Sequence, residues 1–272
     1  MGSNSENKME SKIYLGDCLE LMKDIPDKSI DMILCDLPYG TTACKWDTII
    51  PFEPLWEQYE RIIKDNGAIV LTASQPFTSA LVMSNIKMFK YEWIWEKSRS
   101  SNFMHSKFQP LKSHENVLIF SKFPSAQNSA SKNMNYNPQF TRGNPYNKGR
   151  NIIDNMRHLQ GGSKVGVYNI NITGDRYPRS VQYFVTAELE GKLHPTQKPV
   201  ALFEYLIKTY TNEGDLVLDN CAGSFTTAIA CLNTNRKYIC MEKEEEYFEI
   251  GKNRIKNHVI ENPVAKQTKE FF

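Results

Sequence analysis

Short apolar runs alternate with segments of helical periodicity along most of this chain. The apolar runs cover residues 12–15, 32–35, 68–72, 91–95, 116–120, 215–218 and 237–241. The helical segments lie at residues 18–22, 52–64, 76–85, 202–210, 225–232 and 244–259. Because strands that are apolar on both sides are buried on both faces, the alternation predicts an α/β fold with a mostly parallel sheet between two helical layers. A chain of 272 residues with 40% hydrophobic side chains can bury such a core.

The run at residues 32–35 ends on Asp36, Leu37, Pro38, Tyr39 and a glycine. Pro38 cannot donate to a sheet ladder, so the chain leaves the sheet there. Asp36 and Tyr39 are therefore expected on a stiff loop at the carboxyl edge of the sheet, where open α/β sheets bind ligands. A carboxylate accepts hydrogen bonds from an amino group, and a ring stacks on a flat heterocycle. The pair suits a purine or pyrimidine amine, but taken alone these residues favour an ordinary β-turn.

A second constellation lies near the C-terminus. The strand at residues 215–218 ends at Asp219, a loop of small residues follows, and the next strand ends at Glu242. Such a loop lets backbone approach a ligand, and an acid about twenty residues further on can hold a ribose diol. The G-x-G-x-x-G spacing is missing, since Phe225 stands where a second glycine is expected after Gly223. A nucleoside ligand without a pyrophosphate is therefore favoured over a dinucleotide, whereas Glu242 alone would indicate only a surface acid.

Residues 123–191 have a different texture, dominated by Asn, Ser, Gly and Pro. Over residues 122–182, nine basic residues accompany two acids, Asp154 and Asp175, so this segment carries +7 and the rest −5 within a net charge of +2. Interleaved aromatic residues make the segment suitable for a phosphate backbone and unstacked bases. A solvated, partly disordered insertion would have the same composition. The residues predicted to contact nucleic acid are Lys122, Arg142, Lys148, Arg150, Arg157, Lys164, Arg176 and Arg179.

The six cysteines form no C-x-x-C pair and several fall in apolar runs. This pattern favours buried, reduced thiols in a reducing cytoplasm over zinc ligands or disulfides, and no metal site is predicted. No apolar run approaches the length that spans a membrane. Residues 1–10 are polar and indicate a tag remnant or a loose terminus.

In order along the chain, these motifs resemble those of the β-class DNA amino-methyltransferases. Asp36-Leu37-Pro38-Tyr39 matches the family's Asp-Pro-Pro-Tyr tetrad, with Leu37 in place of the first proline. Residues 219–224 resemble its cofactor loop, usually Asp-Pro-Phe-x-Gly-Ser-Gly, and residues 194–199 resemble its Lys-Pro motif. Lys112-x-His114-Glu115 is also similar to a family pattern. The order of tetrad, variable region and cofactor loop is diagnostic, and the resemblance covers about residues 12–260.

The resemblance implies a Rossmann-like methyltransferase fold with a seven-stranded sheet and a circularly permuted motif order. It divides the chain into a catalytic domain at residues 11–122 and 192–262, a target-recognition insertion at 123–191 and a tail at 263–272. It also implies S-adenosyl-L-methionine as cofactor, double-stranded DNA as partner, no membrane partner, and a cytoplasmic bacterial or phage-encoded protein. The sequence leaves open a homodimer and a cognate restriction enzyme.

The resemblance assigns catalysis to Asp36, Leu37, Pro38 and Tyr39. Asp17 is expected to reach the adenine amine of the cofactor, in addition to serving as a helix N-cap. Phe225 is expected to narrow the cofactor site or to set its affinity. The full set of expected cofactor residues is Asp17, Cys18, Asp36, Thr196, Gln197, Lys198, Asp219, Cys221, Gly223, Ser224, Phe225, Thr226, Glu242 and Lys243.

The implied mechanism begins with a target base swung out of the duplex and stacked on Tyr39. The Asp36 carboxylate and the carbonyl of Leu37 or Pro38 accept the two amine hydrogens, and direct transfer follows without a covalent enzyme intermediate or a metal. In the family an Asp at the first tetrad position favours adenine N6 over cytosine N4. The alternatives are a cytosine-N4 enzyme, an RNA or small-molecule methyltransferase on the same scaffold, and a non-catalytic nucleic-acid-binding protein.

Overall fold

A computed structural model of the chain describes residues 9–41, 44, 47–125, 132–150, 167–187 and 196–261, with backbone alone at 148–150, 167–169 and 261. The chain divides into two compact units, one formed by Met1–Asn137 with Ser180–Phe272 and the other by Pro138–Arg179. The second unit covers a shorter stretch of sequence than the expected insertion at 123–191. Residues 123–137 and 180–191, which flank it within that insertion, belong to the first unit. Asn135 N–H donates to the carbonyl of Asn66 at 2.9 Å, and Asn137 N–H to that of Thr209 at 2.7 Å.

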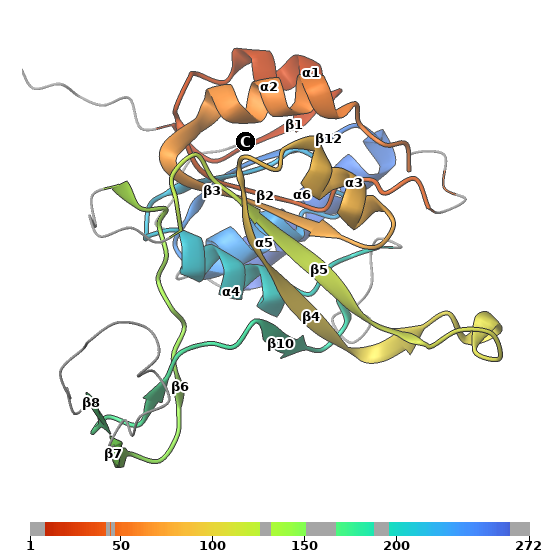
Figure 1. Ribbon diagram of the computed structural model, residues 1–272. Coiled ribbons are helices and arrows are strands. Elements are labelled where there is room, and N and C mark those ends of the chain that lie inside the picture. The colour runs from red at the N-terminus through yellow and green to blue at the C-terminus, as the bar shows by residue number, and fades with distance from the viewer. Residues whose placement is uncertain are drawn as a thin grey trace, which may run out of the picture. The chain divides into compact units, whose positions relative to one another are not determined.

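The first unit is built on one mixed sheet with the strand order β1-β12-β11-β2-β3-β5-β4-β10. Figure 1 shows the long β4–β5 pair running out from the body of this sheet. All neighbouring strands are parallel except the two pairs that β5 makes with β3 and β4. The strands are β1 (Lys12–Leu15), β2 (Ile30–Cys35), β3 (Ile63–Ala73), β4 (Phe89–Ser101), β5 (Lys112–Phe120), β10 (Val181–Phe184), β11 (Leu216–Asp219) and β12 (Lys237–Glu242).

The sheet has eight strands rather than the expected seven, and the additional strand is β10 at the edge. It pairs in parallel with β4, with Val181 opposite Ile94 and Phe184 opposite Lys97. The indole N–H of Trp95 also donates to the carbonyl of Phe184 at 3.0 Å. Its residues alternate between exposed and half-buried and follow a basic, polar segment, so no apolar run marks this strand in the sequence.

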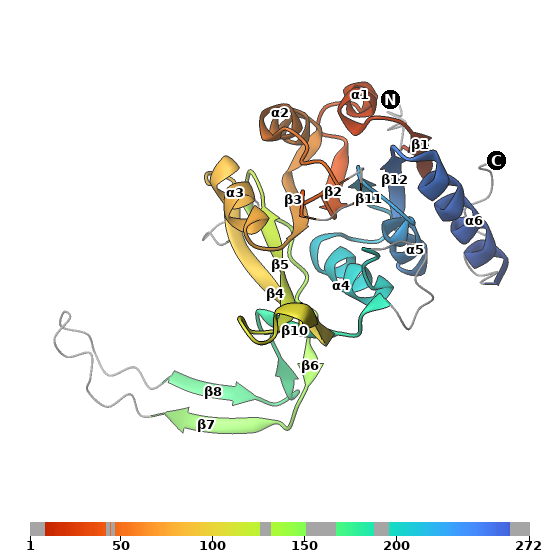
Figure 2. The same cartoon turned by 90° about the vertical axis from the view of Figure 1, so that its right-hand side faces the viewer.

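Helices cover both faces of the sheet, as Figure 2 shows edge-on. On β2 the side chains of Ile33 and Cys35 pack with the first helical layer, and those of Met32 and Leu34 pack with the second. This alternation follows from the two-residue period of a strand and explains why residues 32–35 of β2 are all apolar. The first layer contains α1 (Cys18–Leu21), α2 (Phe52–Ile62) and α3 (Phe77–Ser84), and the second contains α4 (Val200–Tyr210), α5 (Thr226–Asn233) and α6 (Glu245–Glu261).

The second unit contains two short antiparallel ribbons, β6 (Thr141–Arg142) with β9 (Asp175–Arg176) and β7 (Tyr146–Arg150) with β8 (Val167–Asn171). Arg176 ties this unit together, since its guanidinium lies 4.7 Å from the centroid of the Tyr146 ring and donates to the carbonyl of Gly174 at 3.0 Å. A second guanidinium nitrogen donates to the carbonyl of Asn144.

Candidate active site

A cavity of about 670 Å³ opens at the carboxyl edge of the sheet. The segments that follow β1, β2, β11 and β12 reach it together, because these four strands run in the same direction. Residues 196–198, just before α4, complete the wall. All the predicted catalytic and cofactor residues except Phe225 line this cavity: Asp17, Cys18, Asp36, Leu37, Pro38, Tyr39, Thr196, Gln197, Lys198, Asp219, Cys221, Gly223, Ser224, Thr226, Glu242 and Lys243.

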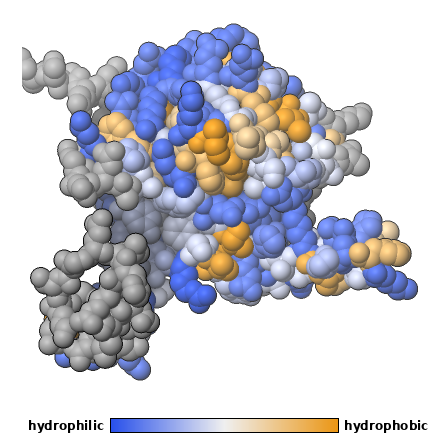
Figure 3. All heavy atoms as spheres, viewed as in Figure 1, coloured by the Kyte–Doolittle hydropathy of each residue, from blue (hydrophilic) through white to orange (hydrophobic). Residues whose placement is uncertain are grey.

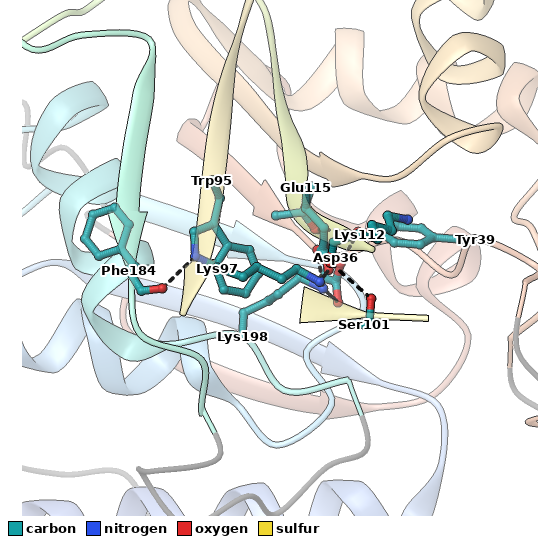
Figure 4. Close-up of polar contacts among 10 residues, drawn as sticks. Asp36, Tyr39, Trp95, Lys97, Ser101, Lys112, Glu115, Phe184 and Lys198 are labelled. Carbon is teal, nitrogen blue, oxygen red and sulfur yellow. Dashed lines mark hydrogen bonds and ion pairs between the residues drawn. The ribbon is translucent and has the colours of Figure 1, made fainter. Parts of the chain in front are cut away.

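Three donors hold the Asp36 carboxylate in the cavity wall. Its Oδ1 accepts hydrogen bonds from the Tyr39 hydroxyl at 2.7 Å and from the Thr72 hydroxyl. Its Oδ2 accepts from Nζ of Lys198 at 2.8 Å, as Figure 4 shows. The side chain of Leu37, where the family has a proline, is 3% exposed and packs in the core, so this departure leaves the carboxylate in place.

Tyr39 presents one face of its ring to the cavity. The other face stacks on Phe77, with the ring centroids 5.1 Å apart and an angle of 26° between the planes. Burial raises the pKa of Tyr39 well above its ordinary value, so the phenol stays neutral and keeps its proton for Asp36. The uncovered face is thus the surface on which a planar ligand can stack.

The loop after the tetrad is fixed by Asp47. Its carboxylate accepts from the N–H of Gly40 at 2.8 Å and from the N–H of Thr41 at 2.9 Å. Gly40 has φ +66°, and a Cβ at this position would lie 3.0 Å from Cγ1 of Ile49. A glycine is therefore required where the chain turns away from the tetrad.

Behind Asp36 lies a buried ion-pair network. Nζ of Lys198 is 3.3 Å from Oε2 of Glu115, and Nζ of Lys97 pairs with Oε1 of the same carboxylate. The side chains of Lys198, Glu115 and Lys97 are only 7%, 12% and 13% exposed. Burial disfavours the charged form of Glu115 and would raise its pKa. The ammonium groups of Lys198 and Lys97 outweigh burial, so the pKa of Glu115 is held below its ordinary value. Likewise, Asp36 and Glu115 outweigh burial and raise the pKa of Lys198.

The roles of Thr72, Lys97 and Glu115 were not predicted from the sequence. Thr72 could have been singled out from the sequence because its hydroxyl stands at the end of the apolar run in β3, close to the carboxyl edge of the sheet. Glu115 belongs to the Lys112-x-His114-Glu115 pattern, but its position depends on the β4–β5 register, in which Trp95 lies opposite Glu115.

Two carboxylates stand at the ends of β1 and β12, which are paired with Leu15 opposite Glu242. Glu242 accepts from the N–H of Gly223 at 2.7 Å and from the N–H of Glu244 at 2.8 Å. Asp17 accepts from the N–H of Leu19 at 2.9 Å, so it is the N-cap of α1 as well as part of the cavity wall. Both carboxylates keep lone pairs for further donors, as a ligand with hydroxyl and amino groups would need.

Asp219 lies at the floor of the cavity and is 3% exposed. It accepts from the Thr227 hydroxyl and from the N–H of Cys221 at 3.1 Å. Burial raises the pKa of Asp219 to about 7, although these hydrogen bonds oppose the shift. Through its hydrogen bonds with Cys221 and Thr227, the Asp219 side chain holds the small-residue loop to the start of α5.

This pKa predicts how Asp219→Asn changes stability with pH. Because the folded pKa lies above the unfolded value, the folded state binds the proton more tightly, and this stabilising contribution is full at low pH and is lost as pH rises through about 7. We expect the Asn variant, which carries no charge, to have a Tm several degrees above that of the unaltered protein at pH 8.5, with the gain shrinking towards pH 5. Calorimetry at the two pH values checks this, and an equal Tm difference at both would contradict it.

The expected cofactor contact of Phe225 is not supported, because its ring is fully buried and does not line the cavity. It packs edge-on against Phe248 with centroids 5.7 Å apart. Its backbone has φ +60°, which suits the glycine that the family has there. Gly251 makes room for the ring, since a Cβ at that position would lie 2.6 Å from Cγ of Phe225.

Lys122 and Arg176 are two of the predicted DNA-binding residues, and both contact other parts of the protein. Lys122 follows β5, which is antiparallel to its neighbours, so it lies at the sheet edge opposite the cavity and donates to the carbonyl of Ile63 at 3.1 Å. Arg176 is engaged within the second unit, as described above. Arg142 and Arg179 are exposed. The side chains of Lys148 and Arg150, and all of Arg157 and Lys164, lie outside the described residues.

The described part of the chain lacks two further kinds of feature. Its helices include none that is long and apolar enough to cross a membrane. Nor do its described His, Cys, Asp and Glu residues come together in a group of three that could hold a metal ion.

The profile of a DNA methylase family, the N6/N4 methyltransferases, matches residues 30–253, which include the tetrad, the cofactor loop and Glu242. The chain belongs to this family. The N6/N4 enzymes transfer a methyl group from S-adenosyl-L-methionine to an amino group of DNA, and this chain is such an enzyme.

Among the curated N6/N4 relatives, the DNA adenine methyltransferase YhdJ of Escherichia coli is 29% identical over 94% of this chain and 87% of its own length. The type II methyltransferase M.HpaI of Haemophilus parainfluenzae is 27% identical over 91% of this chain and 74% of its own length.

Solved structures of N6/N4 enzymes share the fold. A complex of M1.HpyAVI with S-adenosyl-L-methionine superposes with a TM-score of 0.59 at 25% identity, over 90% of this chain and 98% of that one. The cytosine-N4-specific PvuII methyltransferase gives a TM-score of 0.61 over 96% and 94% of the two chains, and at 16% identity this likeness concerns the fold alone.

The cavity fits the cofactor of the N6/N4 family. Its volume of about 670 Å³ lies within the usual range for small-molecule sites. The carboxylates of Asp17 and Glu242 are the kind of acceptors that the amine and the diol of a nucleoside require, and the backbone N–H of Gly223 contacts Glu242.

Proposed function

We propose that this enzyme methylates the N6 amine of adenine at a specific short sequence in double-stranded DNA. The observation that carries the proposal is the Asp36 carboxylate, held at the cavity wall beside the uncovered face of Tyr39. A carboxylate next to a stacking surface binds a planar ring that bears an amino group. The structure of Asp36 and Tyr39 therefore matches the reacting part of the substrate.

Residues on the far side of the cavity would hold the cofactor. Glu242 would accept from the ribose hydroxyls and Asp17 from the adenine amine, while Thr196 and Gln197 would contact the methionine part. When bound, S-adenosyl-L-methionine supplies an electrophilic methyl group. Ser224 links the two motifs that form this half of the site, because its hydroxyl donates to Oε1 of Gln197 at 3.1 Å.

The chain's own groups orient the amine. The target base must leave the duplex, because the exocyclic amine of a paired base is inaccessible. Tyr39 stacks on the extruded base, while Asp36 and the carbonyl of Leu37 or Pro38 accept its two N–H groups. This directs the nitrogen lone pair at the methyl group, and the nitrogen then gives up one proton to Oδ2 of Asp36. Alignment and electrostatics supply most of the rate enhancement.

Adenine is favoured because the tetrad begins with Asp, which in the family leans towards N6, and because the similar YhdJ is named a DNA adenine methyltransferase. Cytosine N4 is the second candidate, since the same carboxylate and ring would suit that amine. The cytosine-specific PvuII enzyme has the same fold and does not separate the two.

We assign DNA contacts to the second unit and, independently, to the loop between β4 and β5 at residues 102–111. Arg142 and Arg179 are exposed, and the segment between Lys97 and Lys112 contains no acid. Ser101 at the end of β4 and Asn102 at the start of this loop line the cavity. Figure 3 shows apolar side chains at the tip of this loop, and the exposed ones are Phe103, Met104 and Phe108. Basic groups suit phosphates and exposed apolar groups suit unstacked bases.

The experiment is expression in a host that lacks its own DNA methylation, followed by sequencing of the plasmid for modified bases. The proposal predicts N6-methyladenine at one short sequence and none in a matched plasmid from cells without the gene. N4-methylcytosine would support the second candidate. Modification of RNA but not DNA in parallel assays of purified protein would contradict the DNA assignment.

A further inference from the structure

Lys198 occupies the place that the target amine would take. Its ammonium donates to Oδ2 of Asp36 at 2.8 Å and lies over the Tyr39 ring, 5.6 Å from the centroid. Phe77 covers one face of that ring, so the ammonium lies on the face that is open to a base. Oδ1 of Asp36 already accepts from Tyr39 and Thr72, which leaves Oδ2 as the acceptor for an incoming N–H group. The ammonium and the substrate amine therefore compete for one carboxylate oxygen and one ring face.

Displacing a buried ammonium from its counter-ion is costly unless a second carboxylate receives it. Glu115 is that carboxylate, because its Oε2 lies 3.3 Å from Nζ of Lys198 and has no hydrogen-bond partner among the described residues beyond this ion pair. Its other oxygen, Oε1, is paired with Lys97. A small movement of Nζ would thus exchange Asp36 for Glu115 without leaving the ammonium unpaired.

We propose that Glu115 is a positioning residue that takes the Lys198 ammonium from Asp36 when the target amine enters. Before substrate binds, Lys198 fills the amine position and keeps the Asp36 carboxylate paired. After the exchange, Oδ2 of Asp36 carries its full negative charge towards the amine. This inference rests on the proposed function, and it applies to adenine N6 and cytosine N4 alike because both amines donate N–H groups.

A double-mutant cycle on Glu115 and Lys198 tests the exchange. In Glu115→Gln the ammonium has Asp36 as its only carboxylate partner, so we expect the single-turnover rate of methyl transfer to fall roughly 100-fold. Lys198→Gln removes the competitor, so in that background the same Glu115 change should cost less than about threefold. The cofactor Kd, measured by isothermal titration, should stay within about twofold between Glu115→Gln and the unaltered protein.

Glu92→Gln is the matched control, since it makes the same chemical change to an exposed carboxylate that binds Nδ2 of Asn116, the residue after Glu115. We expect it to retain the unaltered rate. Equal losses from Glu115→Gln in both backgrounds would overturn the proposal, and so would a Glu115→Gln variant that turns over normally. Failure of the proposed function would show itself differently, as absence of methyl transfer to DNA amines by the unaltered protein.

Discussion

Asp36→Ala should lower the rate of methyl transfer by about a thousandfold while leaving cofactor affinity within a few-fold of the unaltered value. In the proposed mechanism this carboxylate binds the reacting amine and receives its proton, so its loss affects the chemical step. Lys198 keeps Glu115 as a counter-ion in this variant, which protects the fold from an unpaired buried charge. Isothermal titration with S-adenosyl-L-methionine and a single-turnover assay on DNA measure the two effects separately.

Asp27→Ala is a suitable control for Asp36→Ala, because it removes an exposed carboxylate that pairs with Arg61 far from the cavity wall. We expect it to transfer methyl groups at the normal rate. An Asp36→Ala enzyme with substantial turnover would show that the amine is oriented by other groups. A variant that lost cofactor binding as well would place Asp36 in the cofactor site instead.

Glu242→Ala should weaken cofactor binding by about 100-fold or more, the effect expected when charge-assisted hydrogen bonds are lost. The change removes the acceptor expected for the ribose diol. It also leaves the N–H groups of Gly223 and Glu244 without the carboxylate that now fixes the loop. Methyl transfer at saturating cofactor should fall much less than affinity does, in contrast to Asp36→Ala.

The control for this variant is Glu246→Ala, in an exposed side chain of the first turn of α6 that does not line the cavity. Its cofactor Kd should equal that of the unaltered protein. If Glu242→Ala bound S-adenosyl-L-methionine as tightly as this control does, the assignment of the ribose site to the end of β12 would be wrong.

The position of the main acids could be predicted from sequence because each follows an apolar strand. Asp36, Asp219 and Glu242 end or follow strands that run in the same direction, so the topology of a parallel sheet alone brings them to one edge. The N-cap role of Asp17 was equally local, since a single residue before a helix specifies it. The family resemblance then supplied the chemistry.

Other parts of the site depend on contacts that no local pattern encodes. Glu115 and Lys97 meet near Lys198 because of the register between two antiparallel strands, which hydrophobic periodicity does not fix. The DNA contact of Lys122 stays a prediction, and the sequence did not show that the reversed direction of β5 places Lys122 at the sheet edge opposite the cavity. The direction of the Phe225 ring depends on the space left by Gly251, which follows 26 positions later in the chain.

We propose that this cavity methylates an amine of DNA, with adenine N6 as its target. The most direct measurement is digestion of a duplex to nucleosides after reaction with purified protein and cofactor carrying a labelled methyl group. We predict that the label appears in N6-methyldeoxyadenosine and is lost with Asp36→Ala. Label in N4-methyldeoxycytidine would contradict the choice of adenine, and label on a ring carbon, or none in DNA, would contradict amine methylation itself.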